Sequence, residues 1–233
     1  MGSKARIANE ILPIILKNRK PDQYYVEPFC GGCNIIDKVD GNRIASDSNK
    51  YLIEMFKGLQ ENYNRPIEIR KELYNRARTE YNNGTNIEFS DFEIGWIGFM
   101  GSFNGRFFDG GYSGIVGKRN YISEQIRNTE SQIRNIIGIE FNSCSYNELD
   151  IPYNSIIYCD PPYKDTKQYS TSKNFDHDKF WAWCDSMVKK GHKVYVSEYS
   201  APDGWRIVWQ KEVFNSLDLN TGSKKGTEKL FTK

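Results

Sequence analysis

Hydrophobic positions alternate between strand-like and helix-like spacings over residues 1–60, and do so again from residue 139 onward. Ile7, Ile11 and Ile15 recur at helical spacing, whereas the unbroken apolar run 155–159 is typical of a strand buried on both faces of a parallel sheet. The predicted strands are 24–29, 43–47, 139–142, 155–159, 193–197 and 205–209. The predicted helices are 6–16, one opening at 34–36, one capped by Asn49 and one over 178–190, and a hairpin is expected over 216–231. This alternation predicts an α/β fold, Rossmann-like, with a mostly parallel twisted sheet and helices on both faces.

The pattern changes between about residues 61 and 138. A charged helix is predicted over 65–81, an apolar and aromatic one over 89–100, and an amphipathic one over 123–137. Between the last two, residues 103–121 form an irregular stretch rich in glycine, aromatic and basic residues. We therefore expect a largely helical insert, 61–138, between the two parts of one sheet domain, 1–60 and 139–233.

Composition narrows the class of protein. The chain has 233 residues, of which 38% are hydrophobic and 27% charged, a composition typical of a soluble globular protein with a proper core. The net charge is only +2, so a nucleic-acid surface would have to come from local clusters of basic residues. We expect a cytoplasmic protein, because no apolar run approaches the ~20 residues of a membrane span and the N-terminal pattern lacks a signal-peptide core.

The cysteines give little reason to expect a metal. The five cysteines are scattered, so reduced thiols are expected in the cytoplasm. Cys30 and Cys33 have the spacing of a zinc pair, but a second pair is missing and the only histidines are His177 and His192. We therefore expect no metal.

The most informative motif is Asp160-Pro161-Pro162-Tyr163, directly after the predicted strand 155–159. Ligands of open α/β sheets bind beyond the carboxyl ends of strands. The prolines stiffen the turn, the carboxylate and free carbonyls accept hydrogen bonds, and the Tyr163 ring offers a stacking face. The set suits a planar ring that carries an exocyclic amino group. The alternative is a simple strand-ending turn.

A second set of residues predicts a cofactor site. The segment 27–32, Glu-Pro-Phe-Cys-Gly-Gly, follows the first strand, and its glycines allow a ligand to approach the backbone closely. Asp47 ends the next strand, where an acid binds ribose hydroxyls in nucleotide folds. The alternative is a turn and a capping Asp. Together Glu27, Asp47 and Asp160 would repel phosphates, so they favour S-adenosylmethionine over NAD or ATP.

These motifs, in this order, resemble the Dam-like N6-adenine DNA methyltransferases of bacteria and their phages. The similar segments are Gly2-Ser3-Lys4, the 27–32 loop, Ala45–Asn49 with Leu52-Ile53, Phe103–Arg106, Phe141–Tyr146 and Asp160–Tyr163. The chain departs from the family pattern by starting almost at Gly2-Ser3-Lys4 and by carrying Cys33 at the third glycine of the loop. The recognition region does not match well enough to carry over a target sequence.

The resemblance implies a class I methyltransferase fold and a site-specific DNA methyltransferase that moves a methyl group from S-adenosylmethionine to adenine N6, leaving S-adenosylhomocysteine. Its partner would be double-stranded DNA with a flipped adenine, in a bacterial or phage-infected cell, with no obligatory protein partner. The implied catalytic residues are Asp160, Pro161, Pro162 and Tyr163. The cofactor residues are Lys4, Glu27, Phe29, Gly31, Gly32, Asp47, Ser145, Tyr146 and Asp160. The DNA-binding residues are Asn104, Arg106, Lys118, Arg119, Lys167 and Lys173.

Two other functions fit the same motifs. One is a methyltransferase of the same fold that acts on RNA or on a protein amide; the insert and the motif order argue against it. The other is a catalytically silent DNA-binding relative, which the intact Asp47, Asp160 and Tyr163 argue against. The aromatic residues between 103 and 121 have two interpretations as well: they stack on DNA, or they form the core of the insert.

Overall fold

A seven-stranded sheet forms the centre of the protein in the computed structural model, which describes residues 4–163, 175–214 and 225–233. The strand order is β5-β2-β1-β6-β7-β9-β8. The strands are β1 (Tyr25–Glu27), β2 (Arg43–Ser46), β5 (Ile139–Asn142), β6 (Ile156–Cys159), β7 (Lys193–Glu198), β8 (Arg206–Phe214) and β9 (Lys225–Thr232). The first five in the order are parallel, and β9 is antiparallel to both of its neighbours. The mostly parallel sheet confirms the predicted fold class.

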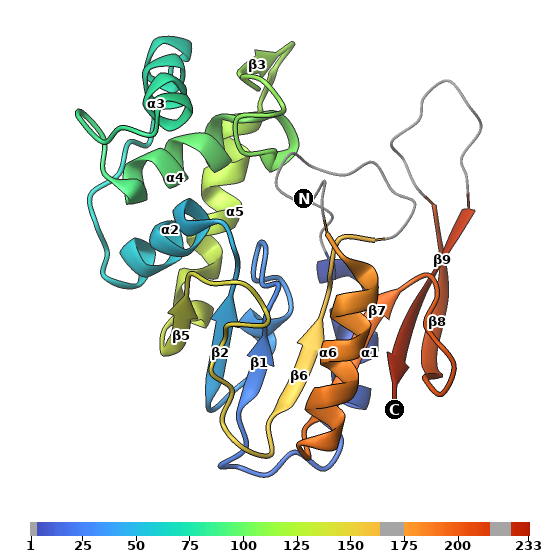
Figure 1. Cartoon of the computed structure of the whole chain (residues 1–233). Coiled ribbons are helices and arrows are strands. Elements are labelled where there is room, and N and C mark those ends of the chain that lie inside the picture. The colour runs from blue at the N-terminus through green and yellow to red at the C-terminus, as the bar shows by residue number, and fades with distance from the viewer. Residues whose placement is uncertain (1–3, 164–174, 215–224) are drawn as a thin grey trace.

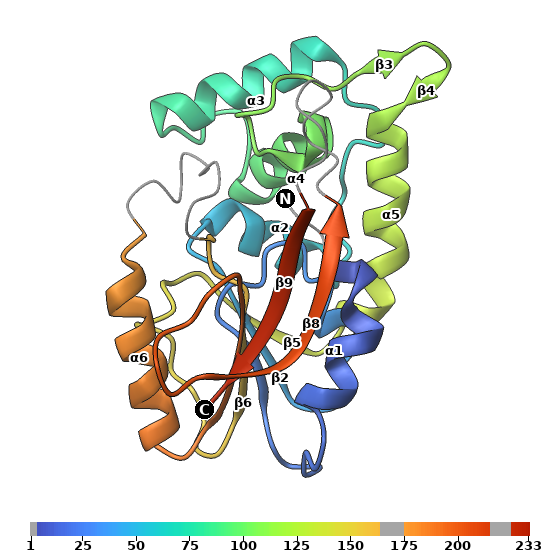
Figure 2. The same cartoon turned by 90° about the vertical axis from the view of Figure 1, so that its right-hand side faces the viewer.

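Helices cover both faces of the sheet, and this explains the unbroken apolar runs. Along β6, Ile156 packs into one hydrophobic cluster with α1 (Ala8–Ile15), and Ile157 packs into a second cluster with α6 (His177–Lys189). Figure 2 shows α6 on one side of the sheet and α1 with α5 (Tyr121–Ile136) on the other. A strand covered on both faces needs apolar residues at every position, because neither face meets water.

The helix after Asn49 also forms as predicted. It is α2 (Lys50–Gln60), and the Asn49 side chain accepts hydrogen bonds from the Tyr51 and Leu52 amides at 3.1 and 3.4 Å. Such a cap satisfies amides that have no partner inside the helix. The chain then leaves the sheet toward the insert.

The insert lies beyond the carboxyl ends of β1, β2 and β6 (Figure 1). Its elements are α3 (Lys71–Asn83), α4 (Asp91–Gly101), η3 (Phe103–Gly105), β3 (Ile115–Val116), β4 (Arg119–Asn120) and α5. Helix α4 packs closely on α2, since a Cβ atom on Gly95 would lie 2.1 Å from the Tyr51 carbonyl oxygen. The division of the chain at residues 61 and 138 stays a prediction.

Two predicted helices differ from the structure. The one expected to open at 34–36 is only a short 3-10 turn, η2 (Ile36–Lys38). Val39 is already extended, and Arg19 binds the Asp40 and Asn42 carbonyls, so the chain must return directly to β2. The helix expected over 65–81 begins only at Lys71.

Tertiary contacts explain the late start of α3. The Pro66 carbonyl accepts a hydrogen bond from the Trp96 indole at 2.9 Å, and Arg65 pairs with Glu130 at 3.3 Å. These contacts fix residues 65–70 in a non-helical course that local helix propensity does not predict.

The C-terminal region also differs in its boundaries. The strand expected to end at residue 209 continues to Phe214, and β8 and β9 form one long antiparallel hairpin. The expected turn at 220–222 lies outside the described residues.

Candidate active site

Four polar side chains from distant parts of the sequence meet beyond the carboxyl end of β6. Asp160 follows β6 directly, Tyr163 lies three residues further on, Lys4 comes from η1 (Lys4–Arg6) and Glu228 from β9. The Lys4 ammonium donates to the Tyr163 hydroxyl at 2.6 Å and lies 3.2 Å from a Glu228 oxygen and 3.5 Å from an Asp160 oxygen. The structure thus brings Lys4 to the catalytic motif.

The charge state of Asp160 depends on this cluster. Burial raises the pKa of the Asp160 carboxyl above its usual range, while the Lys4 ammonium and a hydrogen bond from Tyr163 oppose that rise. Burial alone would lower the pKa of Lys4, but the carboxylates of Asp160 and Glu228 raise it above its ordinary value. Lys4 and Asp160 therefore each favour the charged form of the other.

Tyr163 is half-buried and its ring has a second aromatic neighbour. The Tyr199 ring packs against it nearly perpendicularly, with ring centroids 4.8 Å apart. Burial, followed by the negative charge of Asp160, raises the pKa of the Tyr163 hydroxyl well above its usual range. Tyr163 is therefore a neutral, fixed ring at the site.

Asp47 joins the two predicted cofactor segments. Its carboxylate accepts hydrogen bonds from the Gly31 amide at 3.2 Å and from the Asn49 amide at 3.0 Å. Gly31 adopts a left-handed conformation with φ 45°, which favours glycine. Burial raises the pKa of Asp47, and the two amide hydrogen bonds partly offset this rise. The carboxylate therefore ties the loop after β1 to the end of β2.

Glu27 lies deeper than a surface ligand would. It is 3% exposed, and the Tyr25 hydroxyl donates to its carboxylate at 2.9 Å. Burial raises the pKa of Glu27 well above its usual range. A role of Glu27 in cofactor binding stays a prediction.

Phe29 and Tyr146, both predicted to bind the cofactor, contact each other. Their rings stack with centroids 5.3 Å apart, and Phe180 packs on both rings from α6. Ser145 is half-buried next to them, and its amide donates to Glu148 at 3.2 Å. These residues form an aromatic wall beside the cofactor loop, residues 27–32.

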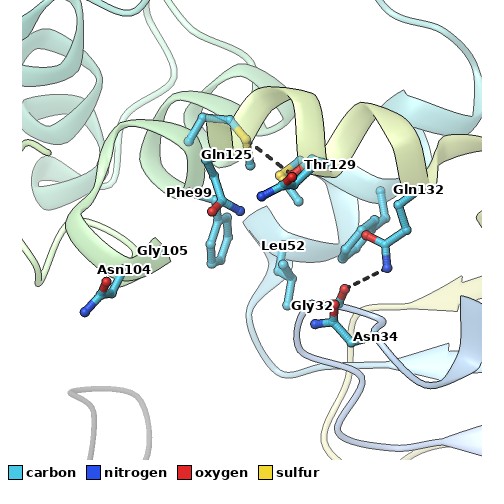
Figure 3. A pocket seen from close by; sticks show the side chains of 13 residues that line it. Gly32, Asn34, Leu52, Phe99, Asn104, Gly105, Gln125, Thr129 and Gln132 are labelled. Carbon is cyan, nitrogen blue, oxygen red and sulfur yellow. Dashed lines mark hydrogen bonds between the residues drawn. The ribbon is translucent and has the colours of Figure 1, made fainter. Parts of the chain in front are cut away.

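A cavity of about 250 Å³ lies between the cofactor loop and the insert. Figure 3 shows Gln132 of α5 reaching toward this loop, and its amide nitrogen lies 3.1 Å from the Gly32 carbonyl and 3.0 Å from the Cys33 carbonyl. The lining residues are Gly32, Asn34, Leu52, Met55, Phe56, Phe99, Met100, Asn104, Gly105, Gln125, Asn128, Thr129 and Gln132. Gln132 therefore links the cofactor loop to the insert.

The described DNA-binding candidates lie in two parts of the insert. Asn104 belongs to η3 and has a left-handed backbone conformation with φ 54°. Arg106 directly follows η3. Lys118 is exposed in the turn between β3 and β4, whereas Arg119 pairs with Glu124 at 2.7 Å. Lys167 and Lys173 lie outside the described residues.

Most of the aromatic residues near these positions belong to the core of the insert. Phe108 is 2% exposed, and Phe107 stacks on Phe99 with centroids 4.7 Å apart. Tyr112 packs on Tyr74 and donates to the Ile69 carbonyl at 2.8 Å. Phe108 is therefore a core residue of the insert. Phe107 and Tyr112 are half-buried and pack on residues of α3 and α4, which favours the core interpretation for them, while a stacking role on DNA stays the alternative prediction.

Sequence reasoning missed three residues of this region: Glu228, Tyr199 and Gln132. None belongs to a recognisable motif. Tyr199 becomes a neighbour of Tyr163 because β7 adjoins β6 in the sheet. Glu228 reaches Lys4 because β9 adjoins β7.

Among the described residues, no three His, Cys, Asp or Glu side chains are grouped as metal ligands would be. Cys30 and Cys33 are free and buried. Within the same part of the chain, no helix is long and apolar enough to cross a membrane.

Comparisons with known proteins place the chain in a family. It is similar to the crystal structure of SMU.472, a protein assigned as a methyltransferase and complexed with SAH, at 12% sequence identity and a TM-score of 0.38. That match covers 98% of this chain but only 52% of the other, so the chain spans about half the length of that protein. The family model for D12 class N6 adenine-specific DNA methyltransferases matches residues 1–220 and confirms the predicted family. The chain belongs to the D12 class of N6 adenine-specific DNA methyltransferases.

Proposed function

We propose that this protein is a site-specific DNA methyltransferase that transfers a methyl group from S-adenosylmethionine to adenine N6 in double-stranded DNA. The observation that carries the proposal is the meeting of Asp160, Tyr163 and Lys4 at the carboxyl end of β6, next to the strand that leads into the cofactor loop. Membership in the adenine-specific family supports the choice of base.

The cofactor would lie across the carboxyl ends of β1, β2 and β5. Asp47 would accept from the ribose hydroxyls, and the cofactor loop would approach the ligand through Gly31 and Gly32. The half-buried Asp47 carboxylate and the aromatic wall formed by Phe29 and Tyr146 fit an adenosine better than a phosphate group. Lys4, Glu27, Ser145 and Asp160 complete the proposed set.

The bound cofactor supplies an electrophilic methyl group, so the protein has mainly to hold the amine in line with it. Asp160 would accept one N–H of the target amine and the Pro161 carbonyl would accept the other. An aromatic amine is a poor nucleophile while its lone pair is delocalised in the ring, and these two acceptors favour a tetrahedral nitrogen. Asp160 is the stronger acceptor when ionised, and the neighbouring Lys4 ammonium favours the ionised form.

The target base must leave the duplex to reach these acceptors. The Tyr163 ring would then replace the lost stacking, which is worth ~1–3 kcal/mol per base. Pro162 stiffens the turn that presents the ring. The perpendicular contact with Tyr199 supports this role, because it fixes the ring before the base arrives.

The insert would bind the DNA. Asn104 lines the cavity between the insert and the cofactor loop, Arg106 follows two residues later, and Lys118 lies at the tip of the β3–β4 hairpin. Ile115 and Val116 in that hairpin are 69% and 63% exposed, so an apolar edge accompanies the basic residue. Basic residues serve phosphates, and apolar residues can enter between base steps. Lys167 and Lys173 remain proposed contacts.

A methyl-transfer assay tests this function. The protein is given isotopically labelled S-adenosylmethionine with duplex DNA, RNA or a protein mixture, and we expect label only in DNA. Asp160→Asn, which keeps the shape but not the charge, should lose nearly all transfer, and calorimetry on the wild-type protein measures binding of the cofactor. Label in RNA or protein alone would contradict the proposal, and cofactor binding without any transfer would indicate a silent relative.

A further inference from the structure

We propose that Glu228 is a positioning residue, which holds the Lys4 ammonium against Asp160 and Tyr163 and so keeps the acceptor of the target amine charged and oriented. This inference rests on the proposed function and deepens it. Neither the catalytic motif nor the cofactor loop contains Glu228, and its role follows from contacts alone.

The sheet topology explains why a residue near the end of the chain reaches the catalytic edge. Strand β9 enters the sheet antiparallel to β7, with Glu198 paired to Lys229 and Val196 paired to Phe231. The first residues of β9 therefore lie beside the last residues of β7, at the edge where the parallel strands have their carboxyl ends. Glu228 adjoins Lys229 at that edge, where Asp160 also lies.

Lys4 needs such an anchor. It belongs to a 3-10 turn of three residues, and lysine has a long side chain with many rotamers. Tyr163 and Asp160 contact it from the motif, and Glu228 contacts it from β9. The side chains of Lys4, Asp160 and Glu228 are 13%, 23% and 18% exposed, so water screens these contacts less than it screens a surface ion pair.

Glu228 affects the pKa of Asp160 in two opposing ways, directly through its charge and indirectly through Lys4. The negative charge of Glu228 raises the pKa of Asp160 directly, but the opposing effect of the Lys4 ammonium is larger. The net effect of Glu228 on the pKa of Asp160 therefore depends on how closely it keeps the Lys4 ammonium beside that carboxylate. Other titratable groups that interact with Asp160 are Glu27 on β1, Tyr158 and Cys159 on β6, and Tyr163 after β6. Glu198 on β7 interacts with Tyr163.

A second ion pair provides a matched control. Lys211 of β8, the register partner of Glu228, pairs with Glu10 of α1, so the same hairpin contacts the N-terminal segment at two places. The Lys211 and Glu10 side chains are 47% and 38% exposed. Loss of this pair would test attachment of the N-terminal segment without touching Lys4 or Asp160.

Steady-state kinetics with saturating DNA and S-adenosylmethionine test the inference. Glu228→Gln should lower kcat about tenfold, the scale of one hydrogen bond to a charged group, with the KM for DNA and the cofactor Kd within about twofold of wild type. Lys4→Met should lower kcat at least as much. Lys4→Met combined with Glu228→Gln should lose no more kcat than Lys4→Met alone, because without Lys4 only the direct repulsion between Glu228 and Asp160 is left to remove. Glu10→Gln should keep the wild-type kcat.

Reactivity of the Lys4 amine gives a readout that does not need methyl transfer. At about pH 9, below the ordinary pKa of lysine, an acylating reagent should modify Lys4 several-fold faster in Glu228→Gln than in wild type, because loss of the carboxylate lowers the pKa of the ammonium. Mass spectrometry of the N-terminal peptide measures this rate. Faster labelling in a protein that methylates no adenine would contradict the proposed function but support the Glu228–Lys4 link.

Three results would overturn the inference: a wild-type kcat in Glu228→Gln, additive losses in the double variant, or unchanged labelling of Lys4. If Glu228→Gln does not fold, Glu228→Asp replaces it, since it keeps the charge and shortens the reach by one methylene. That variant should show an intermediate kcat with an unchanged melting temperature. A wild-type kcat in Glu228→Asp together with wild-type Lys4 labelling would again contradict the role.

Discussion

The catalytic edge of the sheet and the tip of the insert use charge in different ways. At the edge, Lys4 is 13% exposed and contacts groups from two distant segments. At the tip, Arg119 is 59% exposed and pairs with Glu124, only five residues away. Half-buried charges hold one arrangement, whereas exposed pairs are weak and exchange partners easily. The difference fits the roles proposed for the two regions, which are to fix one amine at the edge and to bind a charged polymer at the tip.

The seam between the two regions is apolar and tight. Gly95 of α4 lies against the backbone of Tyr51, and Gly58 of α2 lies against the Phe92 ring. Gln132 adds polar contacts from α5 to the cofactor loop. We therefore expect changes at the edge, the seam and the tip to affect different properties of the protein.

The largest effect is expected at the cofactor end of the catalytic edge. Asp47→Ala should weaken S-adenosylmethionine binding by ~1.5–3 kcal/mol, the scale of hydrogen bonds to a charged group. The loss has two sources: the proposed ribose contact and the amide hydrogen bonds that shape the loop. Titration calorimetry measures it, with Asp150→Ala, an exposed position, as the control. Unchanged affinity in Asp47→Ala would remove Asp47 from the cofactor site.

At the seam, Gly95→Ala should lower the free energy of unfolding by about 1–3 kcal/mol, the usual cost of overpacking. The new methyl group would meet the Tyr51 carbonyl, a backbone atom that cannot rotate away. Denaturant unfolding gives the value, and Asn75→Ala on the exposed side of α3 should change stability by less than about 0.5 kcal/mol. An unchanged denaturant midpoint of unfolding in Gly95→Ala would mean that α2 and α4 leave room for a methyl group at this position.

Lys4→Met should also shift the pH dependence of turnover. Lys4 lowers the pKa of Asp160, so its loss raises that pKa further above the ordinary value. Transfer needs ionised Asp160 and fails as the pH falls through its pKa, so the acid limb of kcat should move to higher pH. Lys4→Arg keeps the positive charge, so the acid limb of its pH profile of kcat should stay near the wild-type position. A limb that stays in place or moves to lower pH in Lys4→Met would contradict the proposed coupling.

The smallest effects are expected at the tip of the insert. Lys118→Ala should weaken DNA binding and reduce the salt dependence by about one phosphate contact. Arg119→Ala should do less, because Arg119 must give up Glu124 to reach a phosphate. Affinities measured at several salt concentrations compare the two variants, and cofactor affinity should stay constant in both. A larger loss in Arg119→Ala would show that its pairing with Glu124 does not compete with DNA.

The sequence predicted the sheet and the motif positions well for a physical reason. Burial on both faces produces unbroken apolar runs such as 155–159, and the polar loops that follow these runs meet at one edge of the sheet. Glu228 could not be predicted, since its place depends on a strand that enters the sheet antiparallel. The aromatics of the insert were ambiguous for a similar reason: composition does not distinguish core residues such as Phe108 from exposed ones such as Phe103.

The most direct test of the central claim is mass spectrometry of nucleosides from duplex DNA treated with the protein and S-adenosylmethionine. We expect N6-methyladenine as the methylated product of the wild-type protein and almost none from Asp160→Ala, which lacks an acceptor for the target amine. Tyr163→Phe should retain much of the product, because stacking needs only the ring. N4-methylcytosine or 5-methylcytosine as the product, or full activity in Asp160→Ala, would contradict the account.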